Sequence, residues 1–407
     1  MKSGWKTKTL EEACQFSNGL WKGVKPPFVN VGVIRNTNFT REGALDDSDI
    51  AYLDIEAKKF EKRRLQFGDI ILEKSGGGPK QPVGRVALFD KAEGDFSFSN
   101  FTAALRVRDP HDLDFRFLHK LLYWTYVSGV TEGMQSHSTG IRNLDGDAYK
   151  AIKIKFPPVP EQQRIVGILD EASDGIATAK ANAEKNLQNA RALFESHLQS
   201  IFTQRGLGWV EKPLSELCNP QRVITYGVIK LGDEILDGVP CLRTSNVRWL
   251  RIDTDGMKRI APALSSEYSR TILKGGEVLV NVRGTLGGVA VASREMAGWN
   301  VSREVAVVPV DSSRVNPAFL SYLIGSGASQ QWLGGVKKGA AYVGINIEDL
   351  RLLPVSAPRL DKQLEVVRHL ALLQEETRRL ESLSQRKLAT LDALKKSLLH
   401  RAFCGAL

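Results

Sequence analysis

Two short motifs in this sequence of 407 residues have the residue types of DNA-modifying chemistry. Glu56-Ala57-Lys58 has the Glu-x-Lys spacing of metal-dependent nucleases, but no convincing Pro-Asp partner precedes it. Lys25-Pro26-Pro27-Phe28 has the prolines and the aromatic residue of a loop that holds a target amine for methyl transfer. The first side chain of such a loop must accept a hydrogen bond, whereas a lysine ammonium only donates. Neither motif therefore predicts catalysis.

The other groups that could act as nucleophiles, bases or metal ligands are scattered. The six histidines, at positions 111, 119, 137, 197, 369 and 400, have no metal-ligand spacing, and the four cysteines, at 14, 218, 241 and 404, form no CxxC pair. No GxSxG elbow occurs, and Gly76 to Gly78 form neither a Walker loop nor a dinucleotide-binding motif. We expect no catalytic residue, no bound cofactor and no metal site in this chain.

The chain is basic, with a formal charge of +10 and a pI near 9.3. An excess of lysine and arginine attracts polyanions such as nucleic acid, although charge alone is equally compatible with a basic surface that only aids solubility. Polar, glycine-containing segments separate the apolar runs at residues 18–27, 73–85, 135–143, 219–227, 281–288 and 336–346. Glycine lets a backbone approach a ligand closely, so these segments are candidate DNA-binding loops.

Long cationic and amide side chains in these loops are the candidate DNA contacts. Lysine and arginine neutralise phosphates, while arginine, asparagine and glutamine also pair with base edges. The candidates for phosphates are Lys22, Lys25, Lys74, Lys80, Arg85, Lys337 and Lys338, and those for base edges are Arg142, Gln221, Arg222, Arg283 and Asn346. The sequence recognised by such contacts does not follow from residue types, because DNA shape contributes to it.

The two halves of the chain repeat each other. GWKTKTLEEAC, residues 4–14, aligns without gaps on GWVEKPLSELC, residues 208–218, at an offset of 204. Five more matches follow in the same order, and they include Arg35 with Arg243 and Asn38 with Asn246. Six matches in one order indicate an internal duplication.

Each half combines strands with a single prominent helix in its globular part. Short apolar or alternating runs separated by glycine and polar turns predict strands, for example GDIILEK and TAALRV in the first half and GEVLVNV and EVAVVPV in the second. The segments FRFLHKLLYWTYV and PAFLSYLIGS predict the helices. We therefore expect two similar α+β domains.

A long helix closes each half. Apolar residues from Ile165 fall at 165, 169, 172, 176, 179, 183, 187, 190, 194, 198 and 201, a mean spacing of 3.6. Positions 366, 370, 373, 377, 380, 384, 387, 391, 394 and 398 form a heptad seam, interrupted at Thr377, Ser384 and Lys387. Helices of this length would run about 60 Å. We expect them to pair antiparallel and to hold the two domains at a fixed distance, related by a pseudo-twofold axis.

The start of the first long helix carries a resemblance to a known family. FPPVPEQQRIVGILD, residues 156–170, followed by a long helix and repeated in degenerate form near the C-terminus, resembles the conserved regions of the specificity subunit of type I restriction-modification systems. The second copy, Ala357-Pro358-Arg359-Leu360-Asp361-Lys362-Gln363, departs from the pattern and keeps one proline and one glutamine. The resemblance in length, duplication and helix placement spans the whole chain.

The resemblance implies a division of labour. Residues 1–155 and 207–353 would be target recognition domains that each read one half of an asymmetric, bipartite sequence in double-stranded DNA. Residues 156–206 and 354–407 would be the helical spacers. Two modification subunits, which bind S-adenosylmethionine and methylate adenine, would dock on helices 161–203 and 361–403. Up to two restriction subunits would join the complex and add ATP- and Mg-dependent cleavage.

Two other classes of function stay open at this point. One is a self-contained DNA methyltransferase or nuclease with divergent motifs, and the other is a DNA-binding regulator or scaffold without enzymatic partners. No apolar run approaches the roughly 18 to 20 residues of a membrane helix, and the N-terminal residues have no apolar signal-peptide core. We therefore expect a cytoplasmic protein.

Overall fold

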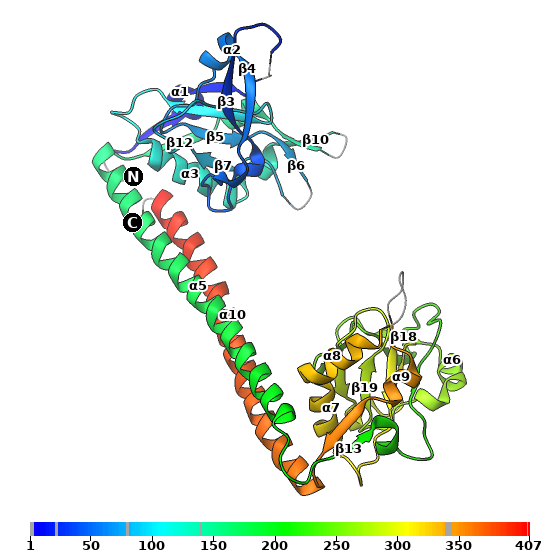
Figure 1. Cartoon of the computed structure of the whole chain (residues 1–407). Coiled ribbons are helices and arrows are strands. Elements are labelled where there is room, and N and C mark those ends of the chain that lie inside the picture. The colour runs from blue at the N-terminus through cyan, green and yellow to red at the C-terminus, as the bar shows by residue number, and fades with distance from the viewer. Residues whose placement is uncertain (1–3, 21–22, 79–80, 139–140, 338–343, 405) are drawn as a thin grey trace. The chain divides into compact units, whose positions relative to one another are not determined.

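The computed structural model of the chain describes residues 4–20, 23–78, 81–138, 141–337, 344–404 and 406–407, with the side chains of residues 137 and 138 left out. It divides into two compact units. Unit 1 contains residues 1–183 and 386–407, and unit 2 contains residues 184–385. Figure 1 labels many of the elements of both units. Each unit therefore contains one globular part and a portion of each long helix.

Two larger sheets form most of the globular part of unit 1, beside a smaller sheet in the order β10 (Gln135–Ser138), β11 (Ile141–Leu144) and β6 (Ser75–Gly77). The first is antiparallel, in the order β2 (Cys14–Asn18), β9 (Thr102–Val107), β5 (Ile70–Glu73) and β7 (Val86–Leu88). The second has β3 (Phe28–Ile34) at its centre, antiparallel to β4 (Ala51–Glu56) and parallel to β8 (Phe96–Phe98). Every residue of β5 is buried, as expected for a central strand covered on both faces.

The globular part of unit 2 repeats this topology. Its first sheet has the order β14 (Thr225–Tyr226), β22 (Val305–Val308), β19 (Val278–Asn281) and β20 (Val289–Val291). In the second, β15 (Val239–Leu242) pairs antiparallel with β18 (Lys258–Ile260) and parallel with β21 (Asn300–Val301). The duplication predicted from the sequence is thus a duplication of the fold.

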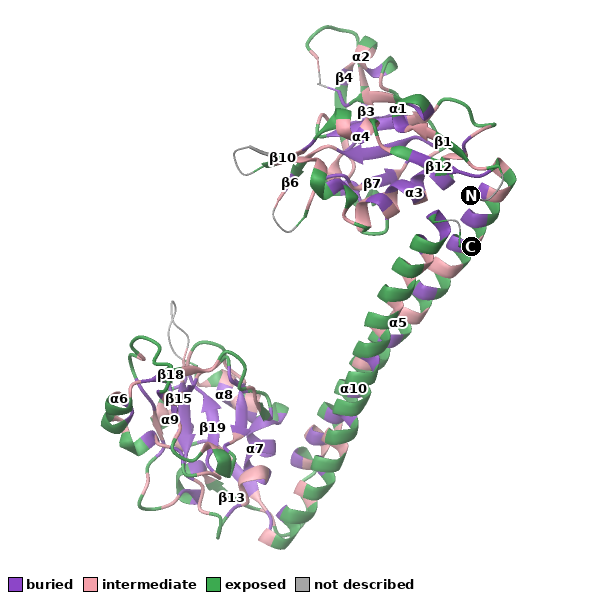
Figure 2. Ribbon diagram, turned by 180° about the vertical axis from the view of Figure 1, so that it is seen from behind, coloured by how far each residue is buried: buried purple, intermediate pink, exposed green. Residues whose placement is uncertain are grey.

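Helices and a two-stranded ribbon complete each unit. In unit 1 these are α3 (Phe115–Val127), the short helices α1 (Leu10–Ala13), α2 (Ala57–Glu61) and α4 (Gly146–Lys150), and the ribbon of β1 (Lys6–Thr9) with β12 (Lys153–Phe156). In unit 2 they are α7 (Pro317–Gly325), α6 (Pro262–Glu267), α8 (Gly327–Gly335), α9 (Ile347–Arg351), and the ribbon of β13 (Val210–Pro213) with β23 (Pro354–Ala357). Figure 2 shows the buried residues gathered in the sheets of each unit.

The long helices are α5 (Val159–Thr203) and α10 (Leu360–Phe403), of 45 and 44 residues. They run antiparallel. In unit 1 Lys180 pairs with Asp392, and in unit 2 the Arg191 Nε lies 2.6 Å from the Glu381 Oε1. The stripe predicted on α5 is confirmed, because none of its eleven residues is exposed. The four segment boundaries given above stay a prediction.

The heptad seam predicted for α10 is partly wrong. Leu380 and Leu394 are 48% and 45% exposed, and Lys387 is exposed too. The polar residues Thr377 and Ser384, which seemed to interrupt the seam, are buried instead. In this part of α10, every second position of the predicted seam lies one residue too early. Glu381, Leu388 and Lys395 are partly buried in place of Leu380, Lys387 and Leu394. An unsupercoiled helix drifts by about 20° per heptad, which accounts for this shift.

Among the described residues, no helix combines the length and the apolar character needed to cross a membrane.

Candidate nucleic-acid interface

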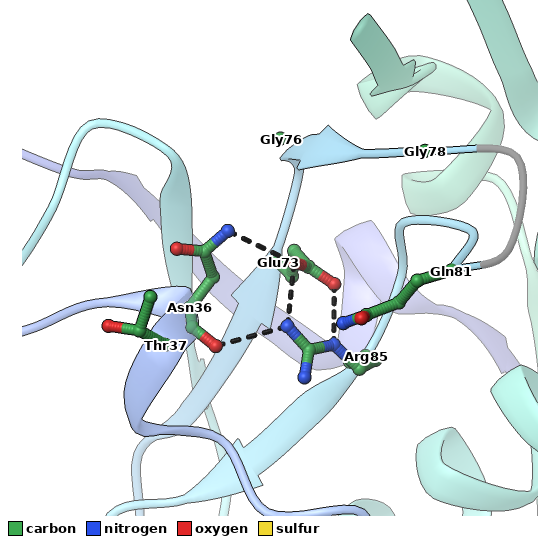
Figure 3. Close-up of a pocket in the computed structure, with 7 residues that line it drawn as sticks. All are labelled: Asn36, Thr37, Glu73, Gly76, Gly78, Gln81 and Arg85. Atoms are coloured by element: carbon green, nitrogen blue, oxygen red, sulfur yellow. Dashed lines mark hydrogen bonds and ion pairs between the residues drawn. The ribbon is translucent and has the colours of Figure 1, made fainter. Parts of the chain in front are cut away.

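A polar pocket of about 760 Å³ opens at the end of β5 in unit 1. Asn36, Thr37, Glu73, Gly76, Gly78, Gln81 and Arg85 line it, as Figure 3 shows. Asn36 and Thr37 belong to the short 3₁₀ turn Asn36–Asn38, which follows β3. Glu73 ends β5, and the glycines belong to the segment around β6 (Ser75–Gly77). The pocket therefore combines the turn after β3 with the end of β5 and the segment that follows it.

A buried carboxylate organises this pocket. The side chain of Glu73 is 1% exposed and accepts two hydrogen bonds from Arg85, each at 2.8 Å from Nε and Nη2. It also accepts one from the Asn36 Nδ2 at 3.1 Å. Burial tends to lower the pKa of Arg85, but the hydrogen bond and the charge of Glu73 outweigh it and raise that pKa. The guanidinium and the carboxylate therefore form a bidentate ion pair in which the two charges offset each other.

Unit 2 has different residues at the equivalent place. Asn281 ends β19 as Glu73 ends β5, and Gly288 precedes β20 as Arg85 precedes β7. The Asn281 Nδ2 donates to the carbonyls of Thr244, Val247 and Thr285 at 3.4, 3.0 and 3.0 Å. A Cβ at Gly288 would collide with the Asn281 Nδ2 and with the Val247 carbonyl. The Asn281 amide and the Val247 carbonyl thus leave no room at position 288 for a side chain such as that of Arg85.

The surrounding frame is the same in both units. In unit 1 the Arg35 N–H donates to the Asn38 Oδ1 at 2.9 Å, and in unit 2 the Arg243 N–H donates to the Asn246 Oδ1 at 3.0 Å. Both asparagines are buried. The sequence matches at these two positions are therefore structural, and the residues next to them are where the units differ.

The structure brings together loops that were predicted separately. In unit 1, β11 (Ile141–Leu144), which contains Arg142, pairs antiparallel with β6. In unit 2, Arg283 forms the matching antiparallel bridge with Gly344. Segments 73–85 and 135–143 therefore meet in unit 1, as do segments 281–288 and 336–346 in unit 2.

The predicted DNA contacts of unit 1 differ in exposure and in whether a neighbouring side chain holds them. Lys25 is exposed. The Lys74 Nζ donates to the Asn18 Oδ1 at 2.9 Å, and burial lowers the pKa of Lys74. Arg85 is held by Glu73, and the partly buried Arg142 donates from Nη1 to the Gln135 Oε1 at 3.5 Å. Lys22 and Lys80 lie outside the described residues.

The predicted contacts of unit 2 divide into exposed side chains and side chains held by a partner. Gln221, Lys337 and Asn346 are exposed. The Arg222 Nη1 lies 2.7 Å from the carboxylate of Glu277, a side chain that is 2% exposed. The guanidinium of Arg283 lies over the Tyr226 ring, with its central carbon 5.2 Å from the ring centroid. Lys338 lies outside the described residues.

Sequence reasoning missed Asn36, Thr37, Glu73 and Gln81. Neutral amides and a single glutamate carry no pattern of their own, and the partners of Glu73 lie 37 residues before and 12 residues after it. The sequence contained one signal for Asn36. Arg35 and Arg243 match between the halves, whereas the residues that directly follow them, Asn36 and Thr244, differ. A differing residue beside a matched one marks a variable position on a common frame.

A second pocket, of about 490 Å³, lies in unit 2 between α5, α10 and the hairpin of β16 (Val247–Arg248) and β17 (Arg251–Ile252). Four arginines and one glutamate line it, namely Arg191, Arg248, Arg251, Arg378 and Glu381. Leu250 makes the turn of this hairpin with φ 55°, a left-handed backbone conformation that is costly for a residue other than glycine. The tight turn places two of the arginines next to each other on one hairpin.

Within the described residues, no group of three or more His, Cys, Asp or Glu side chains could hold a metal ion. Burial raises the pKa values of the Cys14, Cys218 and Cys241 thiols to about 12. Because a thiol reacts as its thiolate, these three cysteines are unreactive at neutral pH.

Comparison with known proteins agrees with the fold. Residues 2–188 match the family model described as the type I restriction modification DNA specificity domain. The chain is 25% identical over 304 residues to the EcoBI specificity subunit of Escherichia coli, a match that covers 69% of this chain and 64% of that protein, slightly under two thirds of its length. It is 24% identical over 393 residues to the EcoKI specificity subunit of Escherichia coli strain K12, covering 92% of this chain and 82% of that protein.

Two solved structures share the fold over the full chain. One comes from a study of the assembly and conformational transition of a type I R-M system, with a TM-score of 0.77, 19% identity, and 100% and 99% of the two chains covered. The other is the HsdS subunit from Thermoanaerobacter tengcongensis, with a TM-score of 0.61, 19% identity, and 100% and 98% covered. In sequence over residues 2–188 and in its duplicated α+β fold over the full chain, this protein is similar to the specificity subunits of type I restriction-modification systems.

Proposed function

We propose that this chain binds double-stranded DNA and selects the sequence at which a type I restriction-modification complex acts. Each unit would read one half of an asymmetric, bipartite target. The observation that carries this proposal is one fold built twice, with the same pairs of loops brought together and with different side chains on them. A common frame with variable contacts suits the reading of two different short sequences.

The long helices would serve as spacer and docking surface. Six leucines on them are between 43% and 67% exposed, namely Leu193, Leu364, Leu372, Leu380, Leu383 and Leu394. Exposed apolar side chains along a helix favour a protein partner. We propose that two modification subunits dock on helices 161–203 and 361–403 and that restriction subunits join them. The cationic pocket between α5, α10 and the β16–β17 hairpin would lie on this surface and would suit acidic groups.

Catalysis would belong to the partners. The modification subunits would bind S-adenosylmethionine and methylate adenine, and the restriction subunits would use ATP and Mg, while this chain would hold no cofactor. The complex would act in the cytoplasm. This arrangement fits the sequence, because the nuclease-like motif around Glu56 and the methyltransferase-like motif around Lys25 both lack residues that catalysis requires.

Methylation sequencing of host DNA with and without the gene tests this function. We expect adenine methylation at one sequence with two defined parts and a fixed gap, and its loss when the gene is deleted. Purification of the native protein should recover an adenine methyltransferase at about two copies per chain.

The same preparations test the two other classes of function. A purified chain that methylates or cuts DNA without partners would identify a self-contained enzyme. Sequence-specific DNA binding without any associated methyltransferase would identify a regulator instead.

A further inference from the structure

The polar pocket around Glu73 is a place where the two matching folds differ in chemistry. The frame residues Asn38 and Asn246 make the same hydrogen bonds in both units. Between the equivalent strands, however, unit 1 holds an ion pair beside an open pocket, whereas unit 2 holds Asn281 bonded to three backbone carbonyls. A frame that is kept while the side chains next to it change points to specificity rather than to folding.

The charge of the pocket argues against a phosphate as its ligand. Its lining contains one carboxylate and one guanidinium, and these two groups form a bidentate pair. The pair has no net charge, and it already uses the Nε and Nη2 of Arg85. A side chain that neutralises a phosphate needs an uncompensated positive charge, and the one guanidinium of this lining is already paired. The pocket instead suits a polar group without charge, such as the edge of a base.

Asn36 presents the hydrogen-bonding groups that such an edge requires. Its Nδ2 donates to the Glu73 Oε1, which fixes the orientation of the amide. Figure 3 shows the Asn36 Oδ1 pointing away from Glu73, and within the described residues no hydrogen bond to this oxygen is found. An amide oxygen held in this way accepts from the amino group of adenine or cytosine, and its second N–H can donate to the N7 of adenine.

The glycines keep the approach to this amide open. A Cβ at Gly76, whose φ is +98°, would lie 3.0 Å from the Asn36 Nδ2. A Cβ at Gly78 would meet nothing within 4 Å. Thr37, next to Asn36, is exposed and adds a hydroxyl that can donate or accept. A base edge can therefore reach the amide past the β6 segment.

From these contacts we infer that Asn36 reads the exocyclic amino group of one base, adenine N6 or cytosine N4, in the half-site bound by unit 1. Glu73 acts as a positioning residue, since it holds the Asn36 amide and is itself held by Arg85. Unit 2 reads its half-site without an amide held by a carboxylate, because Thr244 and Asn281 replace Asn36 and Glu73. The inference rests on the proposed function and adds the chemistry of one contact.

The test uses the complex of the full chain with its methyltransferase subunits. Methylation rates are measured on duplexes in which each base pair of the target is replaced in turn. We expect Asn36→Ala to lower discrimination at one position of one half-site by on the order of tenfold, while every position of the other half-site keeps its preference. The unchanged half-site shows that the variant is folded. Thr244→Ala is the matched control in unit 2, and it should leave the half-site of unit 1 unchanged.

Base analogues identify the atom that is read. Purine in place of adenine, or 2-pyrimidinone in place of cytosine, removes only the amino group at the affected position. The analogue should lower the methylation rate of the wild-type complex by about as much as Asn36→Ala does. In the Asn36→Ala complex it should lower the rate little further. Glu73→Gln, which keeps the shape of the side chain, should reduce discrimination at the same position and at no other.

Two results would overturn the inference. One is unchanged discrimination at every position in Asn36→Ala, and the other is an equal loss of methylation on all sequences, which would show a structural or phosphate-binding role. A wild-type complex without any bipartite preference would instead overturn the proposed function, and this is measured before any variant is made.

Discussion

The side-chain oxygen of Gln162 accepts a hydrogen bond from the backbone N–H of Asp114 at 2.8 Å. Its amide nitrogen donates to the carbonyls of Asp112 and Pro157 at 2.9 and 2.7 Å. Gln162 is fully buried at the start of α5, and Asp114 caps α3. One side chain thus joins the long helix to the prominent helix of the globular part of unit 1.

Unit 2 contains the same junction. The Gln363 Oε1 accepts from the Asn316 N–H at 2.8 Å, and its Nε2 donates to the Pro358 carbonyl at 2.8 Å. The degenerate second copy of the proline-rich motif keeps one proline and one glutamine, and they are these two residues. The junction explains why those positions persist while the rest of the motif has changed.

We predict that Gln162→Ala destabilises unit 1. The change leaves a buried N–H and two carbonyls without their partner, which costs about 1 to 3 kcal/mol in the free energy of unfolding. Urea unfolding followed by circular dichroism measures this cost. Gln163→Ala is the control, because Gln163 is the exposed neighbour on the same helix turn. Equal stability of the two variants would show that the junction does not hold the helix.

We predict an acid-dependent loss of stability from His119. Burial lowers the pKa of His119 from 6.5 to about 4, and its Nε2 bonds the Gly43 carbonyl at 2.8 Å, with Lys120 and Asp170 as the charged groups nearby. Between pH 6.5 and about 4 the unfolded chain binds the extra proton, so stability is full above this window and falls as the pH drops. The shift corresponds to about 3 kcal/mol.

Unfolding titrations of His119→Gln against the wild type measure this contribution. The wild type should lose more stability than the variant between pH 7 and pH 4. His111→Gln, a change at an exposed histidine, should follow the wild type. Parallel curves for His119→Gln and the wild type would contradict the prediction.

Arg283 and Lys337 should differ in what their loss does to DNA binding. Arg283 is held over the Tyr226 ring and bridges to the other loop, whereas Lys337 is exposed. We expect Arg283→Ala to change the preference within one half-site by on the order of tenfold. Lys337→Ala should weaken binding on all sequences and reduce the slope of log affinity against log salt by about one.

Fluorescence anisotropy of the assembled complex on labelled duplexes at several salt concentrations separates these two effects. Lys212→Ala removes a charge from the β13 ribbon, outside the predicted loops, and it should change neither quantity. A uniform loss of affinity in Arg283→Ala would place Arg283 among the phosphate contacts.

The sequence predicted those features that depend on periodicity and repetition. The stripe on α5 and the matched pair Asn38 and Asn246 are confirmed, since a helical period and a repeated frame residue are local signals. The seam of α10 was wrong at Leu380 and Leu394, because a helix of this length drifts away from a strict heptad.

The sequence could not predict which cations are free. Arg85 and Arg222 are held by the buried carboxylates of Glu73 and Glu277, and the second of these partners lies 55 residues away along the chain. Nothing local marks a glutamate that will be buried against a distant arginine. For the same reason no local signal marks the pocket around Asn36, because Asn36 follows β3 whereas its partner Glu73 ends β5, 37 residues later.

The length of the paired helices should set the gap in the DNA target. We predict that deleting seven residues between Lys180 and Arg191, together with seven between Glu381 and Asp392, shortens the preferred gap. Seven residues are nearly two full turns and about 10 Å of helix, so each helix keeps its buried stripe, and the loss corresponds to roughly three base pairs.

Matched insertions of seven residues should lengthen the gap by a similar amount. Deletion in α5 alone is the control and should abolish activity, because it puts the partners Lys180 and Asp392 out of register with Arg191 and Glu381. Methylation sequencing of cells that express each variant gives the gap directly, and an unchanged gap in the double deletion would refute the idea that the helices measure it.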